Sequence, residues 1–229
     1  MPSYPPDHHL LRDLRMQSEW VSEDECIFQA PVVPEVRSST GAMALGPLFA
    51  VADLALISTA IGFAEDDWCG TLDLAIRTGT PVVEGPLFIA CQVLRVGGTL
   101  ITTKAEILDG DRLAGTAIAT SRRMPRNPEY NADGPAPKVI GVPHHWGLAT
   151  SGFTSPINEQ LGLIQVAPGA LELEKTPYVT NSFGTINGGT TGILLCAAAE
   201  SALGGEFTAA DIEVRYMGQA AEGPVRTMS

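Results

Sequence analysis

The sequence predicts an α+β protein built from two related halves, and three observations support this. A glycine turn that leads into an apolar helix occurs twice in the 229 residues, at 42–60 and at 181–203. Each helix is followed by a stretch that ends in a Gly-Pro turn, at 74–87 and at 212–225. In the first half, strand-like segments joined by tight turns follow one another, which is typical of an antiparallel sheet. An internal repeat of this kind determines the architecture of a chain.

The two halves match residue by residue. Aligning Gly46 with Gly189 places Asp53 opposite Cys196. Beyond the helices, one fixed offset pairs Ile76 with Val214, Arg77 with Arg215, Glu84 with Glu222, and Gly85-Pro86 with Gly223-Pro224. The first copy retains an acid on its helix, whereas the second retains the polar approach to its helix: Asn181, Asn187, Gly188 and Gly189. These complementary losses predict one composite site to which both copies contribute.

The individual elements follow from local patterns. Residues 1–19 are expected to form a polar arm with one helical turn near 10–15, and residues 25–33 a strand that ends before Pro34. Pro47 is expected at the first helical position, where its missing N–H costs nothing. The helix is apolar nearly all round, so other elements must cover it on several sides. The expected cover is an antiparallel sheet with strands at 72–77, 87–96, 99–108 and 112–121, and with turns at Gly97-Gly98 and Asp109-Gly110.

Domain boundaries follow from composition. Residues 124–143 are rich in Pro, Asn, Asp and Gly and predict a linker. A strand-like segment at 161–173 precedes the second glycine turn. We therefore expect an N-terminal arm (1–19), a first domain (20–123), a linker (124–155) and a second domain (156–229). The second half stops soon after its Gly-Pro turn, so we expect a domain truncated at its C-terminus that lacks about two strands and leaves an open sheet edge.

Composition excludes several classes of partner. A net charge of −12 argues against nucleic acid or an anionic membrane surface. The apolar run at 42–64 contains Asp53 and is too short as a helix to span a bilayer. The polar N-terminus shows no secretory signal. The scattered cysteines fit reduced thiols in a cytoplasmic protein rather than disulfides or a zinc site: Cys26, Cys69, Cys91 and Cys196.

Both halves resemble hotdog domains, and the whole chain resembles tandem (double) hotdog acyl-CoA thioesterases of the PaaI-like type. The family pattern N-x-x-G-x-x-H-G-G stands in the second half as N-S-F-G-T-I-N-G-G, at 181–189. The first half matches through its helix acid and the strands that follow. The resemblance covers residues 20–123 and 156–229, and it implies an α+β fold of two hotdog domains in tandem. The family histidine is replaced by Asn187 in the second half and by Ala44 in the first.

The resemblance also implies that the two domains pair, with the acid of one facing the glycine turn of the other. One site would then hold Asp53 and Thr71 from the first half and, from the second, Asn181, Asn187, Gly188 and Gly189. Amide N–H groups at a helix start would stabilise the negative charge that develops on a thioester carbonyl. The acid would act as general base for water or attack directly. Thr71 would orient the water, and Asn181 would hold the acid or the carbonyl by hydrogen bonding.

Each of these candidates also has a purely structural interpretation. Asp53 could cap a polar pocket, although acids are seldom fully buried without a partner or a task. Thr71 could simply begin a strand, and the Gly188-Gly189 pair could form a tight turn. Asn187 either replaces the hydrogen bond of the family histidine or only tolerates the turn.

Residues outside this composite site are weaker candidates. The opposite site would hold Cys196 against Leu45 and Gly46, and we expect it to be inactive. The arginines after the last first-half strand would either meet coenzyme A phosphates or lie in a solvated turn: Arg122, Arg123 and Arg126. Two histidine pairs lack metal-ligand spacing and are expected in loops: His8-His9 and His144-His145.

The predicted function is therefore hydrolysis of an acyl-CoA thioester at one composite site, without metal or cofactor. Acyl-CoA is the expected partner, and further hotdog pairing would give a homo-oligomer. One alternative is a non-catalytic acyl-CoA-binding or regulatory hotdog protein. A hotdog enoyl-CoA hydratase is the other, but it would normally need a histidine before the helix. Neither 38–45 nor 181–189 contains one.

Overall fold

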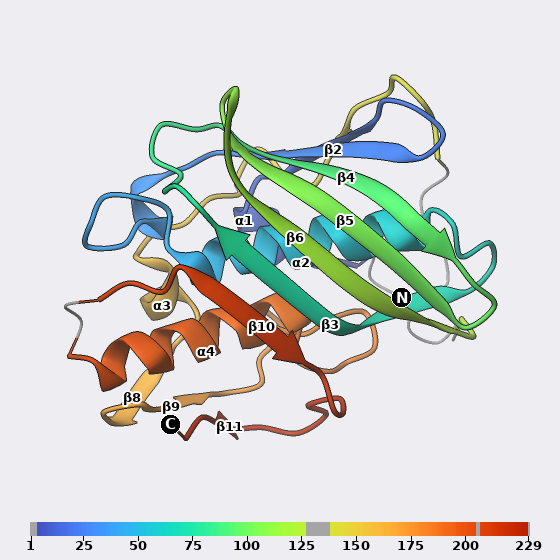
Figure 1. Cartoon of the computed structure of the whole chain (residues 1–229). Coiled ribbons are helices and arrows are strands. Elements are labelled where there is room, and N and C mark those ends of the chain that lie inside the picture. The colour runs from blue at the N-terminus through green and yellow to red at the C-terminus, as the bar shows by residue number, and fades with distance from the viewer. Residues whose placement is uncertain (1–3, 127–137, 205–206, 229) are drawn as a thin grey trace.

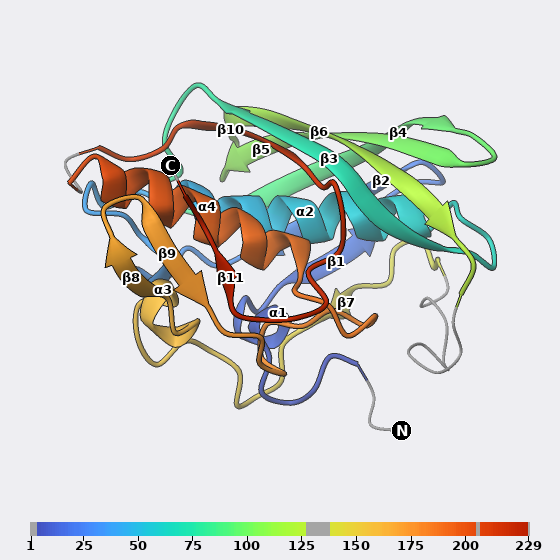
Figure 2. The same cartoon turned by 90° about the horizontal axis from the view of Figure 1, so that it is seen from below.

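The computed structural model describes residues 4–126, 138–204 and 207–228. Its centre is helix α2 (Leu45–Ile61), which lies across the inner face of an antiparallel eight-stranded sheet (Figure 1). A second long helix, α4 (Gly188–Ala202), runs beside α2, and a small three-stranded sheet packs against α4 (Figure 2). The architecture is therefore α+β, as predicted, with α2 enclosed between a sheet and a helix.

The large sheet has the strand order β10-β3-β6-β5-β4-β2-β1-β7. Its strands are β1 (Gln17–Trp20), β2 (Glu25–Ala30), β3 (Trp68–Thr78), β4 (Leu87–Val96), β5 (Leu100–Asp109), β6 (Arg112–Met124), β7 (His144–His145) and β10 (Asp211–Arg215). The small sheet has the order β11-β9-β8, with β8 (Ile164–Ala167), β9 (Ala170–Leu173) and β11 (Val225–Arg226). The short helices are α1 (Leu10–Asp13), the 3-10 turn η1 (Pro34–Val36) and α3 (Ile157–Gln160).

The predicted meander is confirmed, with longer strands than its pattern indicated. β3 begins at Trp68 rather than Leu72, and β6 ends at Met124 rather than Ser121. These ends are held by their mutual pairing, because Trp68 lies opposite Met124 in the sheet. Local alternation cannot reveal such extensions, since cross-strand pairing stabilises them.

Helix α2 is buried along nearly its whole length, as its apolar sequence predicts. The helix begins at Leu45 rather than at Pro47, because Ala44 takes the N-cap position. Pro47 still falls within the first turn, where its missing N–H has no intrahelical partner to lose. No helix in the described part of the chain is long and apolar enough to cross a membrane.

The N-terminal segment differs from the predicted polar arm. It contributes four buried apolar side chains to the core: Leu10, Leu11, Leu14 and Met16. Its end forms β1, which pairs with β2. His9 is buried rather than in an open loop: its Nδ1 accepts from the Leu11 amide at 3.1 Å and its Nε2 donates to the Thr180 carbonyl at 2.8 Å. His144 and His145, also expected in a loop, form β7 on the free edge of β1.

The second half continues the sheet of the first. Its strand β10 pairs antiparallel with β3, placing Val214 opposite Leu74 and Ile212 opposite Ile76. The single strand-like segment expected at 161–173 is instead the hairpin β8–β9, which turns at Gly169. The two halves are therefore joined by backbone hydrogen bonds as well as by helix packing.

The glycine loops before the two long helices make the same backbone hydrogen bonds. The Ser38 amide donates to the Ala42 carbonyl at 2.8 Å, and the Asn181 amide donates to the Thr185 carbonyl at 2.7 Å. Each loop also bonds to the segment beyond its helix. The Met43 amide donates to the Val82 carbonyl at 2.8 Å, and the Ile186 amide donates to the Ala220 carbonyl at 3.0 Å.

Helices α2 and α4 approach closely because glycines line their contact. A Cβ on Gly192 would overlap the ring of Phe49, and one on Gly189 would lie 2.8 Å from Ala50 Cα. The corresponding contact from the other helix is nearly as tight, since a Cβ on Gly46 would lie 3.0 Å from Ile193 Cα. The start of each helix thus packs against the first turns of its neighbour.

Candidate functional site

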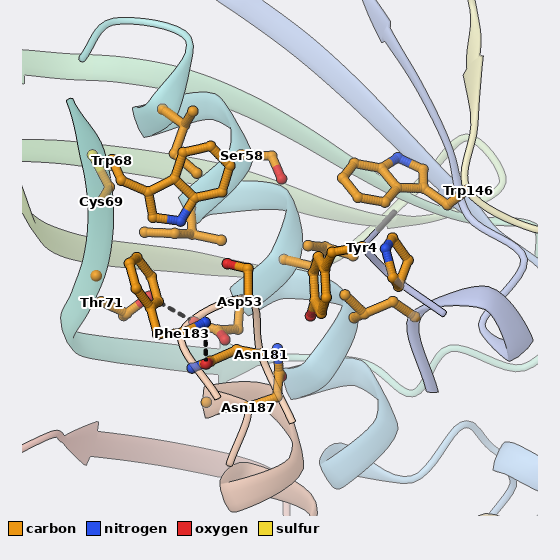
Figure 3. A pocket seen from close by; sticks show the side chains of 18 of the residues that line it. Tyr4, Asp53, Ser58, Trp68, Cys69, Thr71, Trp146, Asn181, Phe183 and Asn187 are labelled. Carbon is orange, nitrogen blue, oxygen red and sulfur yellow. Dashed lines mark hydrogen bonds between the residues drawn. The ribbon is translucent and has the colours of Figure 1, made fainter. Parts of the chain in front are cut away.

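A cavity of about 1020 Å³ lies between α2 and the glycine turn of the second half (Figure 3). Its first-half wall includes Asp53, Trp68 and Thr71. Its second-half wall includes Asn181, Phe183, Asn187, Gly188 and Tyr216, and the N-terminal segment adds Tyr4. The volume is at the upper end of the range for small-molecule sites. The two halves thus share one cavity that could hold a sizeable ligand.

Asp53 lies in the middle of α2 and is only 6% exposed. The hydroxyl of Thr71 in β3 donates to its Oδ1 at 2.9 Å (Figure 3). Burial raises the pKa of Asp53 to about 6, and hydrogen bonds from Thr71 and from the Gly189 amide limit that rise. A carboxyl group with this pKa is mostly ionised at neutral pH and can still accept a proton, as a general base must.

The other oxygen of Asp53 faces the start of α4. A Cβ on Gly188 would lie 2.9 Å from Asp53 Oδ2, so only glycine allows this approach. Gly188 lines the cavity, and no described residue accepts a hydrogen bond from its N–H. This amide points from a helix start, where the dipole favours negative charge. The structure therefore brings a carboxylate and an available amide donor together at one cavity.

Asn187 and Gly189 shape this helix start. Asn187 is the N-cap of α4, and its Oδ1 accepts from the Gly189 amide at 2.9 Å. This is the usual capping interaction of asparagine. Gly189 does not line the cavity and packs on Ala50 instead. Of the two glycines expected to present amides, only Gly188 lines the cavity and has an N–H without an acceptor among the described residues.

Asn181 lines the cavity, but its side chain is engaged within its own loop. Its Oδ1 accepts from the Phe183 amide at 2.9 Å and from the Thr185 amide at 3.1 Å. Its Nδ2 donates to the Thr185 hydroxyl at 2.7 Å. No hydrogen bond joins it to Asp53 among the described residues. Asn181 thus fixes the loop that carries Asn187 and Gly188, which differs from the direct role expected for it.

Tyr216 belongs to the site and was missed by sequence reasoning. Its hydroxyl donates to the Gly188 carbonyl at 2.8 Å, and its amide donates to the Leu72 carbonyl at 2.8 Å. Burial raises the pKa of Tyr216, and the nearby carboxylate of Asp53 raises it further, so the hydroxyl stays protonated. Tyr216 directly follows the repeated strand, and only the pairing of β10 with β3 brings it to Asp53.

The reverse arrangement, in which the start of α2 faces the middle of α4, provides no comparable site among the described residues. A Cβ on Gly46 would lie 3.5 Å from Cys196 Cβ, and Cys196 itself is 4% exposed. Burial raises the pKa of Cys196 to about 12, and Glu200 adds to the rise, so the thiol is neutral. Neither Gly46 nor Cys196 lines the cavity. The position that corresponds to Asp53 is therefore occupied by Cys196, which is packed between the helices and not open to a ligand.

The candidate phosphate-binding arginines lie away from the cavity wall. Arg123 pairs with Asp67 at 3.1 Å and Glu65 at 3.5 Å, and donates to the Ala64 carbonyl at 2.9 Å. This arginine therefore links β6 to the segment between α2 and β3. Two others are exposed and do not line the cavity: Arg122 and Arg126.

The cysteines and histidines form no recognisable metal centre. All four cysteines are buried and free. Within residues 4–126, 138–204 and 207–228, no group of three or more His, Cys, Asp or Glu side chains could hold a metal ion.

No protein-family model matches the sequence, and no curated protein matches it. Several solved structures resemble part of the chain. A mutant of a hypothetical protein from Staphylococcus aureus is 16% identical, has a TM-score of 0.48, and covers 52% of this chain and 100% of its own. A thioesterase from Haemophilus influenzae is 16% identical, with a TM-score of 0.46 and coverages of 49% and 80%. A phenylacetic acid degradation-related protein from Ralstonia eutropha is 22% identical, with a TM-score of 0.41 and coverages of 43% and 75%.

Proposed function

We propose that the chain hydrolyses an acyl-CoA thioester in the cavity shared by its two halves. One observation carries this proposal: the carboxylate of Asp53, with its pKa raised to about 6 by burial, lies beside Gly188, whose amide has no acceptor among the described residues, and both residues line a cavity of about 1020 Å³. A base and an oxyanion donor at one site are the two groups that acyl transfer to water requires.

The proposed reaction uses water as the nucleophile. Asp53 takes a proton from water while the water oxygen adds to the thioester carbonyl carbon. The carbonyl oxygen becomes an oxyanion that accepts a hydrogen bond from the Gly188 amide. The C–S bond then breaks, and the thiolate leaves with the proton that Asp53 held. Thr71 fixes Oδ1 of the carboxylate, which leaves Oδ2 to act on the water.

We also propose that the chain is a tandem pair of hotdog domains, near residues 20–123 and 156–229. The expected arm and linker are not separate from the first domain, because β1 and β7 belong to its sheet. Its two glycine loops make corresponding hydrogen bonds, and its two long helices make corresponding glycine contacts. Both observations support duplication. We further propose a cytoplasmic location, which four free cysteines favour, and association into a homo-oligomer through further hotdog pairing.

Release of free thiol from a panel of acyl-CoAs tests the function directly. Wild type should turn over at least one substrate, and Asp53→Asn should lower kcat by roughly a hundredfold or more, because general-base catalysis typically contributes that much. Asp66→Asn, an exposed acid outside the cavity, is the matched control and should leave the rate unchanged. The wild-type rate should rise with pH through about 6, as the Asp53 carboxyl ionises. Equal rates for Asp53→Asn and wild type would refute the site.

A non-catalytic acyl-CoA-binding protein is the second candidate function. Asn187 occupies the position of the family histidine and is committed to capping α4, which favours this candidate. Micromolar binding of acyl-CoA without any thiol release across the panel would establish it in place of hydrolysis.

A further inference from the structure

Arg12 places its guanidinium group at the wall of the cavity, and no acid in the part of the chain that the structure describes pairs with it. Its Nη1 donates to the Trp146 carbonyl at 2.8 Å, and its Nη2 donates to the Pro5 carbonyl at 2.9 Å. Both partners are neutral. Its Nε is buried and has no hydrogen-bond partner within the described part of the chain. No acid of that part lies within ion-pair distance of Arg12.

The neighbouring Asp13 does not supply the missing negative charge. Its carboxylate accepts from the Tyr178 hydroxyl at 2.9 Å, from the Gly152 amide at 3.0 Å and from Gln160 at 3.4 Å. It is buried and outside the cavity. In a chain with 26 acids and 14 basic residues, an arginine at a cavity with no acid of the described residues beside it is unexpected.

Ser18 provides a second donor on the same wall. Its Oγ accepts from Trp146 Nε1 at 3.3 Å, so its own proton is directed elsewhere. Ser18 is buried, lines the cavity, and donates to no residue that the structure describes. Both Arg12 and Ser18 thus contact Trp146, and Figure 3 shows Trp146 and Tyr4 on the side of Asp53 away from Trp68 and Thr71.

A third side chain on this wall, that of His144, also supplies no negative charge to pair with Arg12. His144 lines the cavity at its exposed side, and partial desolvation lowers its pKa, as do the nearby charges of His145 and Arg12. Its ring is therefore neutral at pH 7. Arg12 is half-buried, and a cation that is partly removed from water is stabilised by an anion that pairs with it. Charge-assisted hydrogen bonds from arginine are among the strongest in proteins.

We propose that the wall formed by Arg12, Ser18 and Trp146 binds a carboxylate at the far end of the acyl group. The preferred substrates are then monothioesters of dicarboxylic acids. This proposal rests on the proposed thioester hydrolysis at Asp53, and it adds the substrate class. A phosphate of coenzyme A would offer similar chemistry. The buried position of Ser18 favours a group that lies inside the cavity with the acyl chain.

The first test measures binding without catalysis. Two non-hydrolysable thioether analogues of coenzyme A are compared by calorimetry, one with a terminal carboxylate and one with a methyl group at the same chain length. Wild type should bind the carboxylate form about tenfold or more tightly, because a hydrogen bond to a charged group contributes that much. Equal affinities, or no binding of either analogue, would overturn the proposal whether or not the protein hydrolyses thioesters.

Variants then assign the preference to Arg12. Arg12→Gln should remove the tenfold preference, whereas Arg12→Lys should keep part of it, and circular dichroism checks that both fold. Arg15→Gln, an exposed arginine outside this cavity, is the matched control and should keep the full preference. An unchanged preference in Arg12→Gln would overturn the assignment.

Pantetheine analogues distinguish the two sources of negative charge. They lack the phosphates of the nucleotide but carry the same acyl groups. If Arg12 binds the acyl carboxylate, its substitution weakens the binding of the carboxylated pantetheine analogue as much as the binding of the carboxylated coenzyme A analogue. If substitution of Arg12 weakens the binding of every coenzyme A analogue equally and leaves the binding of every pantetheine analogue unchanged, Arg12 binds a phosphate. The proposed substrate class is then wrong. Thiol release from the matching thioesters is a separate readout, so its absence would reject hydrolysis alone.

Discussion

Asp53 is a buried acid with few of the partners that buried acids usually have. It has no arginine or lysine partner among the described residues, and the Thr71 hydroxyl is the side chain that donates to it there. Desolvation therefore dominates and raises its pKa to about 6. A residue of this kind lowers the stability of a protein, which is the usual consequence of placing a reactive group in an apolar site.

Asp53→Asn should consequently stabilise the protein at neutral pH. The folded pKa of about 6 lies above the unfolded value, so the stability that this carboxyl contributes is present at low pH and is lost as pH rises through about 6. Asparagine does not titrate. We expect a gain in the free energy of unfolding of about 2–3 kcal/mol at pH 7.5 and little gain near pH 4, measured by urea denaturation. A gain of equal size at both pH values would mean that the charge of Asp53 is not the cause.

The hydroxyl of Tyr216 should matter more for turnover than for binding. It donates to the Gly188 carbonyl and so fixes the peptide beside the Asp53 carboxylate. Tyr216→Phe should lower kcat by roughly tenfold with little change in KM, because misplacing an oxyanion donor weakens the transition state. Tyr178→Phe is the control: it loses a hydrogen bond to Asp13 outside the cavity and should lower stability but not kcat. A rise in KM with kcat unchanged in Tyr216→Phe would contradict the positioning role.

The candidate site could be predicted in part, because the two similar glycine-helix segments of the sequence carry different polar residues. This difference pointed to Asp53 and to the glycine turn, which the structure brings to the same cavity. The actual bonds of Asn181 depend on the path of its own loop, which no pattern specifies. Tyr216 and Arg12 reach the cavity only through tertiary contacts with distant segments. Such contacts leave no local signal in the sequence.

At the scale of elements, the close pairing of α2 with α4 is what brings Asp53 to Gly188. Small residues on both helices allow this approach, and the Phe49 ring fills the space left open by Gly192. Helices α2 and α4 were predictable because each is a long apolar run that follows a glycine turn, and strands β4 to β6 because tight turns separate apolar segments. β1 and β7 were not, since each is short and depends on pairing with a neighbour.

Gly192→Ala should separate the two helices. The added methyl group would overlap the Phe49 ring, and overpacking of a core typically costs about 1–3 kcal/mol. Urea denaturation should show a loss of this size, together with reduced thiol release, because Gly188 moves away from Asp53. Gly98→Ala is the control, since a Cβ there meets nothing within 4 Å. In the double variant Phe49→Ala/Gly192→Ala the two losses should not add, because the smaller side chain makes room for the methyl group. Strict additivity would show that the two residues do not compete for the same space.

At the scale of the whole molecule, the two halves share a sheet and a core. β10 extends the sheet of the first half, and one buried apolar cluster contains residues from α2, α4 and the small sheet. The cavity lies where these parts meet, so its shape depends on both halves being folded together. A site divided in this way ties function to the integrity of the entire chain.

Unfolding should therefore occur in a single transition that both halves share. The three tryptophans lie outside the second-half helix and sheet, at Trp20, Trp68 and Trp146, so their fluorescence follows the first half and the segment after it. Leu173→Ala removes a fully buried side chain from β9 and should cost about 2–5 kcal/mol. Because the core is continuous, tryptophan fluorescence and far-ultraviolet circular dichroism should shift to lower urea by the same amount in this variant. If only the circular dichroism midpoint moves, the halves unfold independently, and the shared core would not be what holds Asp53 against the glycine turn.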